Sequence, residues 1–451
     1  MRITFRASLV GMALALLPLQ AVAAQPPGNT EASSHSTQAA AEKAGIKPIP
    51  VVKSASPNPQ SCSKLQARIR SRSSQATGTA LCTDPVRNVK ISSLPHASAR
   101  PGAAREHLKS SRLSAAGRTR VPLPDWCYDY ADGSGNWLFF RDKACAVSVW
   151  ELKLVDQKTR KQIGRLEYLR DDYLFTEYKT SAWGHQLSID WIEGSETGDT
   201  TGILLQGQGR CEGACKLPSE NVEFPRQPVK TKGYAYGQIN PESTVTESGA
   251  VGTGKSSIIF QFLKPGAKPS NLMLSEPGGG IRCDNATPGI SGTGCVVPDY
   301  RPVFQVSRSG ANPEFARHLS DALASGLPGA YPDGTPLTRM TDRKKARRNG
   351  DRACPQASKG GYPRPTGYSC DEYPFRSTWE GAYTQSPNTP ASGRTFSWCQ
   401  IKKLNPGTGA KGWSACMIKE GQNSGGGTAL KKFYLENRVI EKDKFFVSVI
   451  D

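Results

Sequence analysis

The residues best suited to chemistry gather near the carboxyl end of the chain, in two stretches. The first, GYPRPTGYSCDEYPFRST (361–378), places Asp371 beside Glu372, and the second, KEGQNSGGGTALKKFYLENRVIEKDKFFVSVI (419–450), carries Asn423 before a run of glycines. Carboxylate and amide oxygens can activate water and hold a hard cation, so this combination suits metal-assisted hydrolysis. No histidine follows His318. This disfavours His-paired Ser or Cys nucleophiles and two-His ribonuclease mechanisms here.

A second segment of the sequence suggests a different chemistry. Residues 249–256, GAVGTGKS, match the G-x-x-x-x-G-K-[ST] pattern of phosphate-cradling loops. That mechanism needs an apolar strand before the loop and a helix after it, whereas INPESTVTES precedes the string and SIIFQF follows it. Both flanks are wrong, so we interpret the string as a chance match in a Gly/Ser turn.

The positive charge of the chain is divided between two segments. The 451 residues hold 58 Lys+Arg and 39 Asp+Glu, a net charge of +19. Residues 25–125 contribute +10, residues 126–310 contribute −1 and residues 311–451 contribute +8, and the remaining +2 lies in residues 1–24. Such an excess attracts polyanions without choosing among nucleic acid, anionic lipid and acidic glycan. The run DRKKARRNGDR (342–352) predicts a basic helix that either follows a phosphate backbone or is simply solvated.

The amino end is typical of an exported protein. Arg2 and Arg6 precede an apolar run and then small residues up to Ala24, as in a cleaved secretory leader. The run is too short to span a membrane and no later segment is comparably apolar, so we expect no integral membrane segment. Twelve cysteines in an exported chain favour disulfides. The simplest connectivity joins sequence neighbours: Cys62 with Cys82, Cys127 with Cys145, Cys211 with Cys215, Cys283 with Cys295, Cys354 with Cys370, and Cys399 with Cys416.

Composition divides the chain into four parts. After the leader (1–24), residues 25–124 are rich in Ala, Ser, Pro and basic residues without Phe, Trp or Tyr, which predicts a disordered linker or propeptide. This segment could contact the anionic cell surface. Residues 125–310 alternate apolar and polar residues in AVSVWELKL (146–154), IGRLEYL (163–169), YLFTEYK (173–179), QLSIDWI (186–192) and SIIFQFL (257–263). The alternation predicts an all-β, sandwich-like domain of unknown ligand, followed by a C-terminal domain at 311–451.

The C-terminal stretches resemble a known family, the secreted deoxyribonucleases of the NucA/NucB type, which belong to the ββα-metal (His-Me finger-like) nucleases. The resemblance rests on Pro363, Gly367 and Tyr368 leading into Asp371-Glu372-Tyr373-Pro374, on the Asn-Gly-rich run at 423–427, and on a closing D-x-F-x-V-like strand. It covers about residues 335–451. The family typically has Trp where this chain has Tyr373. The resemblance implies an α+β multidomain protein with a C-terminal ββα-metal-type nuclease domain.

The resemblance also implies roles for individual residues. A hairpin presents the general base, here Asp371, and a following helix presents an Asn oxygen, here Asn423, to one divalent cation, Mg²⁺ or Mn²⁺. Glu372 would orient a metal-bound water or the base, or else be a surface carboxylate without a role. Arg376 is the candidate phosphate clamp. A bond between Cys354 and Cys370 would fix the strand that carries the base.

Further contacts with the substrate are expected from the second stretch. Gly425 and Gly427 would let a phosphodiester approach the backbone and the amino end of a helix predicted from about Thr428 to Asn437, or would only form a flexible turn. Lys431 and Lys432 are weaker candidates for phosphate contact.

The sequence therefore predicts a secreted, metal-dependent endonuclease acting on DNA, or on RNA. The alternative is a non-enzymatic extracellular protein that binds DNA or the cell envelope, and a third hypothesis is a toxin effector.

Overall fold

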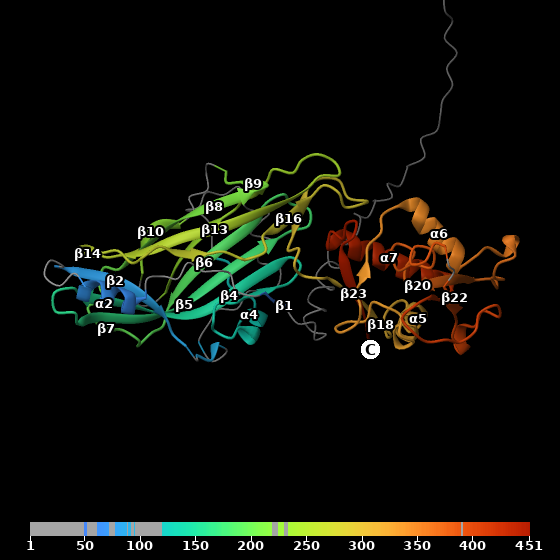
Figure 1. Cartoon of the computed structure of the whole chain (residues 1–451), viewed down its shortest axis with the longest axis horizontal. Helices are drawn as coiled ribbons and strands as arrows, with labels where there is room; N and C mark the ends of the chain where they lie inside the picture. Colours follow the sequence, from blue (N-terminus) through green and yellow to red (C-terminus); the bar gives the residue numbers. More distant parts are fainter. Residues whose placement is uncertain are drawn as a thin grey trace, which may run out of the picture.

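The computed structural model describes residues 49–51, 61–71, 77–87, 89–91, 94, 120–218, 224–229, 233–388 and 391–451. The predicted leader and most of the predicted linker lie outside these residues. The described chain forms an elongated β region up to residue 297 and, beyond it, a C-terminal region of helices and short strands (Figure 1). No helix in the described ranges is long and apolar enough to cross a membrane.

The first sheet of the β region has the strand order β1-β3-β4-β5-β6-β11, and β2, β7 and β14 join it at the side. Its long central strands β4, β5 and β6 pair antiparallel. The strands are β1 Ile49–Val51, β2 Thr79–Pro85, β3 Trp137–Phe139, β4 Lys143–Asp156, β5 Gln162–Thr176, β6 Trp183–Trp191, β7 Thr197–Gly198, β11 Tyr234–Ile239 and β14 Ala267–Lys268.

The second sheet has the order β10-β8-β13-β16-β17, with β15 also paired to β13. A short pair, β9 with β12, and two helices complete the region. The elements are β8 Leu204–Gly213, β9 Cys215–Lys216, β10 Phe224–Pro228, β12 Glu242–Ser243, β13 Val251–Leu263, β15 Met273–Ser275, β16 Ile281–Asp284, β17 Gly294–Val296, α2 Cys62–Ser71 and α4 Asp125–Tyr130.

The two sheets share an apolar core. Successive side chains of a strand point to opposite faces, so the apolar positions of each strand meet on one side. Leu166 and Leu187 of the first sheet lie fully buried in one cluster with Phe260 and Phe262 of β13. The predicted β character of the middle part is therefore confirmed.

Two details of the sequence prediction need correction. Part of the predicted linker 25–124 belongs to the β region: β2 pairs with β4 along its whole length, and the Cys62–Cys82 disulfide joins α2 to it. In addition, the stretches at 163–169 and 173–179 form one strand, β5, rather than two. The charged residues between them do not interrupt it because Arg170 Nε donates to Asp172 Oδ2 at 2.8 Å.

The phosphate-loop-like string lies in a strand. From Val251 onward it is part of β13, which pairs with β8 on one side and β16 on the other. Lys255 stands opposite Glu212 in the strand register. No helix follows the string, which agrees with its interpretation as a chance match.

Six disulfides join the twelve cysteines in the sequence-neighbour pattern expected from their spacing. Two of them, Cys354–Cys370 and Cys399–Cys416, lie in the C-terminal region. Each closes a short loop, which restricts the unfolded chain and stabilises the fold.

The C-terminal region contains two three-stranded sheets and three α-helices. One sheet has the order β18-β23-β19, with β18 parallel to β23, and the other has the order β20-β22-β21. The elements are β18 Val303–Ser307, α5 Pro313–Ala324, β19 Leu337–Thr338, α6 Arg343–Ala353, the 3₁₀ turn η4 Ala357–Lys359, β20 Tyr368–Tyr373, β21 Gly393–Arg394, η5 Ser397–Cys399, β22 Trp413–Lys419, α7 Glu420–Glu436 and β23 Lys444–Ile450.

The predicted domain boundary at residue 310 lies too late in the chain. β18 contributes Phe304 to the core of the C-terminal region, where it contacts the rings of Phe375 and Phe433. The β18 strand follows the β region without a Gly- or Ser-rich linker, so no change of composition marks the boundary.

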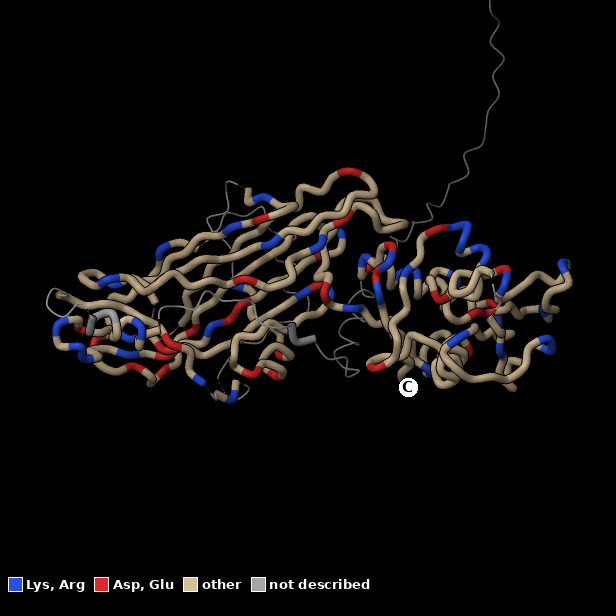
Figure 2. Tube along the Cα trace, in the orientation of Figure 1, with Lys and Arg blue, Asp and Glu red and all other residues tan. Residues whose placement is uncertain are grey.

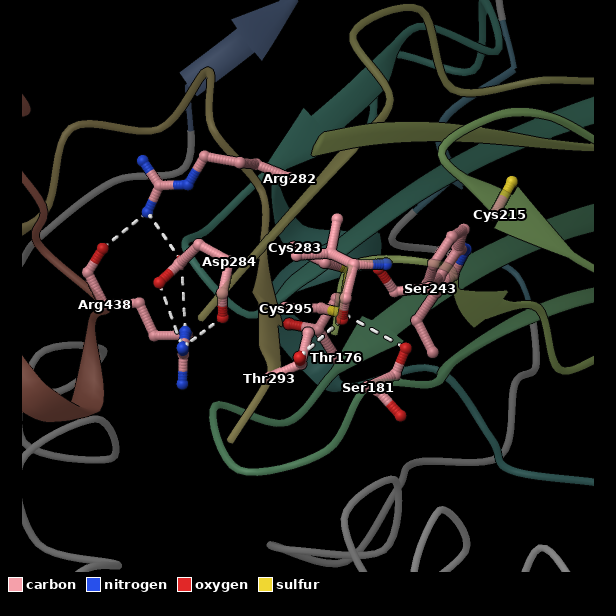
Figure 3. Close-up of a disulfide and its surroundings, with 12 residues drawn as sticks. Thr176, Ser181, Cys215, Ser243, Arg282, Cys283, Asp284, Thr293, Cys295 and Arg438 are labelled. Atoms are coloured by element: carbon pink, nitrogen blue, oxygen red, sulfur yellow. Dashed lines mark hydrogen bonds and ion pairs between the residues drawn. A yellow bond between two sulfur atoms is a disulfide. The ribbon is translucent and has the colours of Figure 1, made fainter. Parts of the chain in front are cut away.

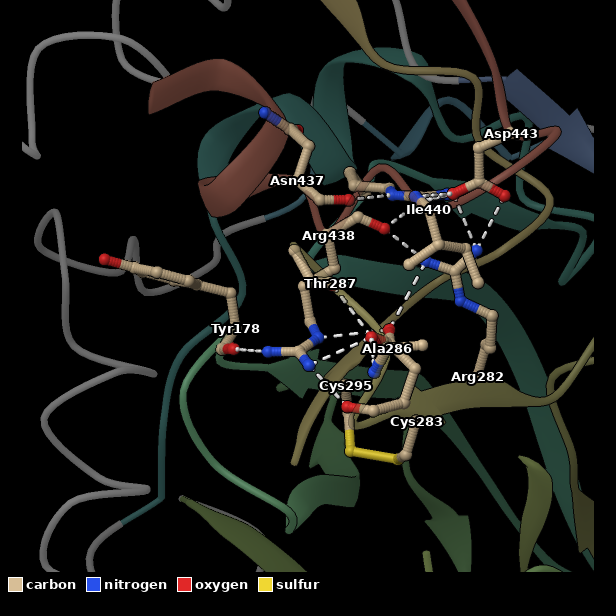
Figure 4. A network of polar contacts seen from close by, with 12 residues as sticks. Tyr178, Arg282, Cys283, Ala286, Thr287, Cys295, Asn437, Arg438, Ile440 and Asp443 are labelled. Carbon is tan, nitrogen blue, oxygen red and sulfur yellow. Dashed lines mark hydrogen bonds and ion pairs between the residues drawn. A yellow bond between two sulfur atoms is a disulfide. The ribbon is translucent and has the colours of Figure 1, made fainter. Parts of the chain in front are cut away.

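A cluster of arginines and aspartates joins the two regions (Figure 4). Arg438, just after α7, is fully buried and reaches into the β region, where its guanidinium contacts the equally buried Asp284 at 3.0 Å. In the opposite direction, Arg141 and Arg282 of the β region both bind Asp443 of the C-terminal region, at 2.8 and 2.7 Å. We call these five residues the interregion cluster.

The cluster also satisfies backbone groups. Arg141 donates to the carbonyl oxygens of Asn437 and Arg438 at the end of α7. Arg282 and Asp284 flank Cys283, whose disulfide to Cys295 lies beside them (Figure 3). Burial, followed by the nearby Arg282, lowers the pKa of Arg141 to about 10. Such desolvation makes each charge depend on its partners.

The placement of β18 can be tested with two fragments. Fragment 311–451 lacks Phe304 and the parallel partner of β23, whereas fragment 298–451 retains both. Loss of a buried Phe alone typically costs about 3–5 kcal/mol, so the shorter fragment should have the clearly lower urea midpoint, or none. Equal midpoints by circular dichroism would contradict the assignment of β18 to this region.

The interregion cluster can be tested in the whole chain. Arg438→Met removes the cation closest to the buried Asp284 carboxylate. The next cation, Arg282 Nη2, is 3.6 Å away. Breaking one side of a buried pair costs about 3–5 kcal/mol, and adding Asp284→Asn should recover part of the loss. Denaturation midpoints followed by tryptophan fluorescence would measure both changes. No recovery in the double variant would show that charge burial is not the cause.

Candidate functional site

The predicted site residues lie on β20, β22 and α7. β20 is an edge strand, it pairs antiparallel with β22 alone, and β22 runs directly into α7. Strand geometry points neighbouring side chains to opposite faces, so Asp371 and Glu372 lie on opposite sides of the pair. The two carboxylates therefore have different surroundings.

Both disulfides of the C-terminal region hold this strand pair. Cys370, directly before Asp371, is bonded to Cys354 at the end of α6. Cys416, which stands opposite Asp371 in the register, is bonded to Cys399. The backbone on either side of Asp371 is thus tied to two other segments.

Asp371 has one oxygen held and the other at the surface. Its Oδ2 accepts a hydrogen bond from His318 Nδ1 of α5 at 2.6 Å, and only 7% of its side chain is exposed. Its Oδ1 accepts no hydrogen bond in the described chain and is not among the fully buried polar atoms without a partner. The small exposed part of the carboxylate therefore includes Oδ1.

Sequence reasoning missed His318. The absence of a histidine after position 318 disfavours His-paired nucleophiles and two-His mechanisms, but it says nothing of His318 itself, which lies against Asp371. Its side chain is fully buried, and its Nε2 lies 2.9 Å from Ser414 Oγ on β22. No local motif reveals the contact because 53 residues separate the histidine from the aspartate. An amphipathic α5 with His318 on its buried face was the available signal.

Glu372 faces a cleft lined by arginines. The cleft has a volume of about 510 Å³ and lies between α6 and β20. Two carboxylates, Glu372 and Asp351, are surrounded there by four guanidinium groups. The lining arginines are Arg343, Arg347, Arg364 and Arg376. We call this the arginine cleft.

The Glu372 carboxyl titrates unusually high. Burial, followed by repulsion from the Asp371 charge, raises its pKa to about 7, while Arg376 opposes the shift. Its side chain is 18% exposed and the Arg376 Nε lies 4.0 Å from its Oε1. A pKa of about 7 leaves this carboxyl partly protonated at neutral pH.

The basic run 342–352 forms α6 as predicted. Asp342 caps the helix by accepting hydrogen bonds from the backbone N–H groups of Lys344 and Lys345. Arg343 and Arg347, one turn apart, line the cleft, and Lys345 lies 4.3 Å from the ring centre of Trp379. Figure 2 shows the resulting row of positive residues along α6. One side of this helix thus belongs to the cleft rather than only to solvent.

Asn423 lies inside a helix, not in a loop before one. The predicted helix at about 428–437 is wrong in its start, because α7 begins at Glu420. The Asn423 amide nitrogen donates to Ser369 Oγ at 2.9 Å and to the Cys370 carbonyl at 3.1 Å. A carbonyl can only accept, so the amide nitrogen must face it, which leaves Oδ1 available. Asn423 thus lies beside the peptide that leads into Asp371.

The glycines after Asn423 do not form a flexible turn, since all three lie within α7. A Cβ on Gly425 would lie 2.2 Å from Asn312 Oδ1, and one on Gly426 would lie 2.5 Å from the Phe315 ring. Their small size therefore allows α7 to pack closely against α5 and its start. Gly427 has open space around it.

The structure does not bring Lys431 and Lys432 to the arginine cleft, whose lining includes neither. They follow Asn423 by eight and nine residues, or about 12–13 Å along the helix axis. Lys431 is exposed, and Lys432 forms a 3.8 Å ion pair with Glu436. Arg376, in contrast, lines the cleft with a side chain that is 68% exposed.

The donor set fits a hard cation held by few protein ligands. Asn423 Oδ1 and Asp371 Oδ1 are both available oxygens near the Cys370 peptide. Among the described residues no group of three or more His, Cys, Asp or Glu could hold a metal ion. These residues could therefore hold an ion such as Mg²⁺, which keeps several waters, rather than one enclosed by protein.

The site combines two adjacent carboxylates with a cleft lined by arginines. Residues 330–448, in the C-terminal part of the chain, match the family model described as Deoxyribonuclease NucA/NucB. The match agrees with the resemblance found in the sequence. No curated protein and no solved structure matches the chain.

The raised pKa of Glu372 predicts a pH-dependent stability difference. A carboxyl whose folded pKa exceeds its unfolded value stabilises the fold at low pH, and this contribution is lost as pH rises from about 4.5 through about 7. Glu372→Gln should therefore raise the thermal midpoint, relative to the unmodified chain, more at pH 8 than at pH 5. Asp333→Asn, at an exposed carboxylate of the same region, is the matched control. A Glu372→Gln difference that is equal at both pH values would contradict the shift.

Proposed function

We propose that the chain is an exported, metal-dependent endonuclease that hydrolyses DNA phosphodiesters in its C-terminal region. The observation that carries the proposal is the arginine cleft against β20, on the strand that also bears Asp371, within the family-matched residues. The six disulfides support an oxidising, extracellular or periplasmic location. The antiparallel pair β20 and β22, with α7 directly after β22, supports the proposal of a ββα-metal-type site.

In the proposed reaction a water molecule attacks phosphorus while Asp371 Oδ1 accepts its proton, and the bond from phosphorus to a sugar oxygen breaks. The leaving oxygen then takes a proton from solvent.

One divalent cation, Mg²⁺ or Mn²⁺, would be held by Asn423, with water in its remaining coordination positions. When bound, such an ion polarises the phosphoryl oxygen and offsets the charge on the leaving group. Asn423 suits this role because its amide nitrogen is fixed by Ser369 and Cys370, so its oxygen has a set direction.

The arginines of the cleft, across the edge strand β20 from Asp371, would hold phosphates that flank the one under attack. Guanidinium groups bind phosphate oxygens through two parallel N–H donors, and Arg343, Arg347 and Arg376 approach the cleft from two elements. Phosphate neutralisation of this kind does not distinguish DNA from RNA, so both belong in the assay. The basic residues of segment 25–124 would add contact with an anionic cell surface, and lie mostly outside the described residues.

A plasmid-nicking assay on the mature chain tests the function. We expect cleavage with Mg²⁺ or Mn²⁺, its loss in EDTA, and a decrease in rate of about 10²–10⁴-fold in Asp371→Ala, the usual contribution of a general base. Asn423→Ala should raise the metal concentration needed for half-maximal rate, whereas Asp333→Asn should change nothing. Cleavage that survives both EDTA and Asp371→Ala would refute the mechanism.

The same preparation tests the alternative function. A non-enzymatic DNA- or envelope-binding protein would retard a labelled duplex in a gel and leave it intact at every metal concentration. Binding without nicking, with folded protein verified by circular dichroism, would replace the proposed activity with this one.

A further inference from the structure

We infer that His318 is a positioning residue for the general base, because its imidazole holds one carboxylate oxygen of Asp371 and is itself anchored to Ser414. The inference rests on the proposed function, in which Asp371 accepts the proton of the attacking water. It adds a residue that lies outside the family-matched range 330–448.

The histidine links three elements at the centre of the C-terminal region. α5 supplies the imidazole, β20 supplies Asp371 and β22 supplies Ser414, with contacts of 2.6 and 2.9 Å. The histidine and the serine are fully buried. The contact is therefore shielded from solvent, which strengthens it and excludes competing water.

The hydrogen-bond network assigns the tautomer. An ionised carboxylate only accepts, so Nδ1 must carry the proton that it donates to Asp371 Oδ2. Nε2 then accepts from the Ser414 hydroxyl, whose other acceptor, the Tyr373 carbonyl, is more distant at 3.5 Å. The carboxylate thus fixes the tautomer, and Ser414 holds the other ring nitrogen.

This arrangement leaves the histidine one role. Complete burial keeps it from touching substrate, so it is not a catalytic residue in its own right. By holding Oδ2 it fixes the rotation of the carboxylate and leaves Oδ1 as the oxygen that can receive a proton. An unheld carboxylate on the edge strand could rotate away from this direction, and small misplacements of a base are costly.

Docking of α5 does not depend on this contact alone. Trp398 Nε1 donates to Asp321 Oδ2 of α5 at 2.7 Å, and Phe315 and Leu319 of the same helix are buried in the core. A change at His318 can therefore alter Asp371 while the helix stays in place. This makes the inference testable in folded protein.

Two amide substitutions separate the two contacts of the ring. The amide of His318→Asn can place an N–H near the position of Nδ1, toward Asp371, whereas the longer His318→Gln reaches toward Nε2 and Ser414. We expect His318→Asn to keep kcat within about threefold. His318→Gln, and His318→Leu as a variant without any polar group, should lower kcat by about 10- to 100-fold with KM unchanged, the usual effect of losing a ligand-orienting partner. Asp321→Asn is the matched control, because it weakens a different α5 hydrogen bond, the one from Trp398, without touching Asp371.

Coupling to Asp371 supplies the decisive measurement. In the background of Asp371→Ala, the further change His318→Gln should cost no additional activity, whereas a general structural role would lower activity again and lower the thermal midpoint as Asp321→Asn does. Full activity of His318→Gln together with loss of activity in Asp371→Ala would overturn the inference and leave the proposed function standing. Full activity of Asp371→Ala would overturn the proposed function itself.

Discussion

The geometry of the site depends on the alternation of side chains along one edge strand. Because β20 is extended, consecutive carboxylates must separate: Asp371 turns toward α5 and the histidine, and Glu372 turns toward α6 and the arginines. The disulfide at Cys370 and the pairing with β22 prevent the strand from slipping by one residue, which would exchange the two environments. One buried carboxylate with a fixed partner and one titrating carboxylate in a cationic cleft thus arise from a single dipeptide.

The site and the β region are connected through the helix that carries Asn423. α7 begins beside β20 and ends at the interregion cluster, where Arg438 is buried against Asp284. The charged groups of this cluster are largely buried, and each loses hydration on burial. The ion pairs therefore fix the orientation of the two regions more than they stabilise the fold. The β region therefore contacts the C-terminal region at the far end of α7, and none of its described residues lines the arginine cleft.

Much of this organisation was predictable from sequence, for identifiable reasons. Alternating apolar residues indicated β4, β6 and β13, and an even set of closely spaced cysteines indicated the disulfides. The position of a disulfide directly before Asp371 could be predicted because Cys370 is its neighbour in the sequence. The basic helix α6 could be predicted from a continuous run of charged residues. The family match confirmed the resemblance that rested on residues 361–450.

The parts that could not be predicted depend on contacts between distant residues. His318 meets Asp371 only because α5 crosses the sheet, and Gly425 and Gly426 are helical only because α5 lies against them. Glycine propensity favoured a turn there, and tertiary packing overrode it. β2 was hidden in an Ala- and Ser-rich segment, where seven strand residues do not alter the overall composition.

The parallel pairing of β18 with β23 has a consequence for how this nuclease region could be inherited or released. β18 precedes the family-matched residues, yet it covers one side of the last strand. A protease that cut between β18 and α5 would leave β23 with unpaired N–H and C=O groups along that side, a template on which another chain could add a strand. Evolutionary transfer of this region to another protein would therefore have to carry β18 with it, or supply a substitute strand from the new host.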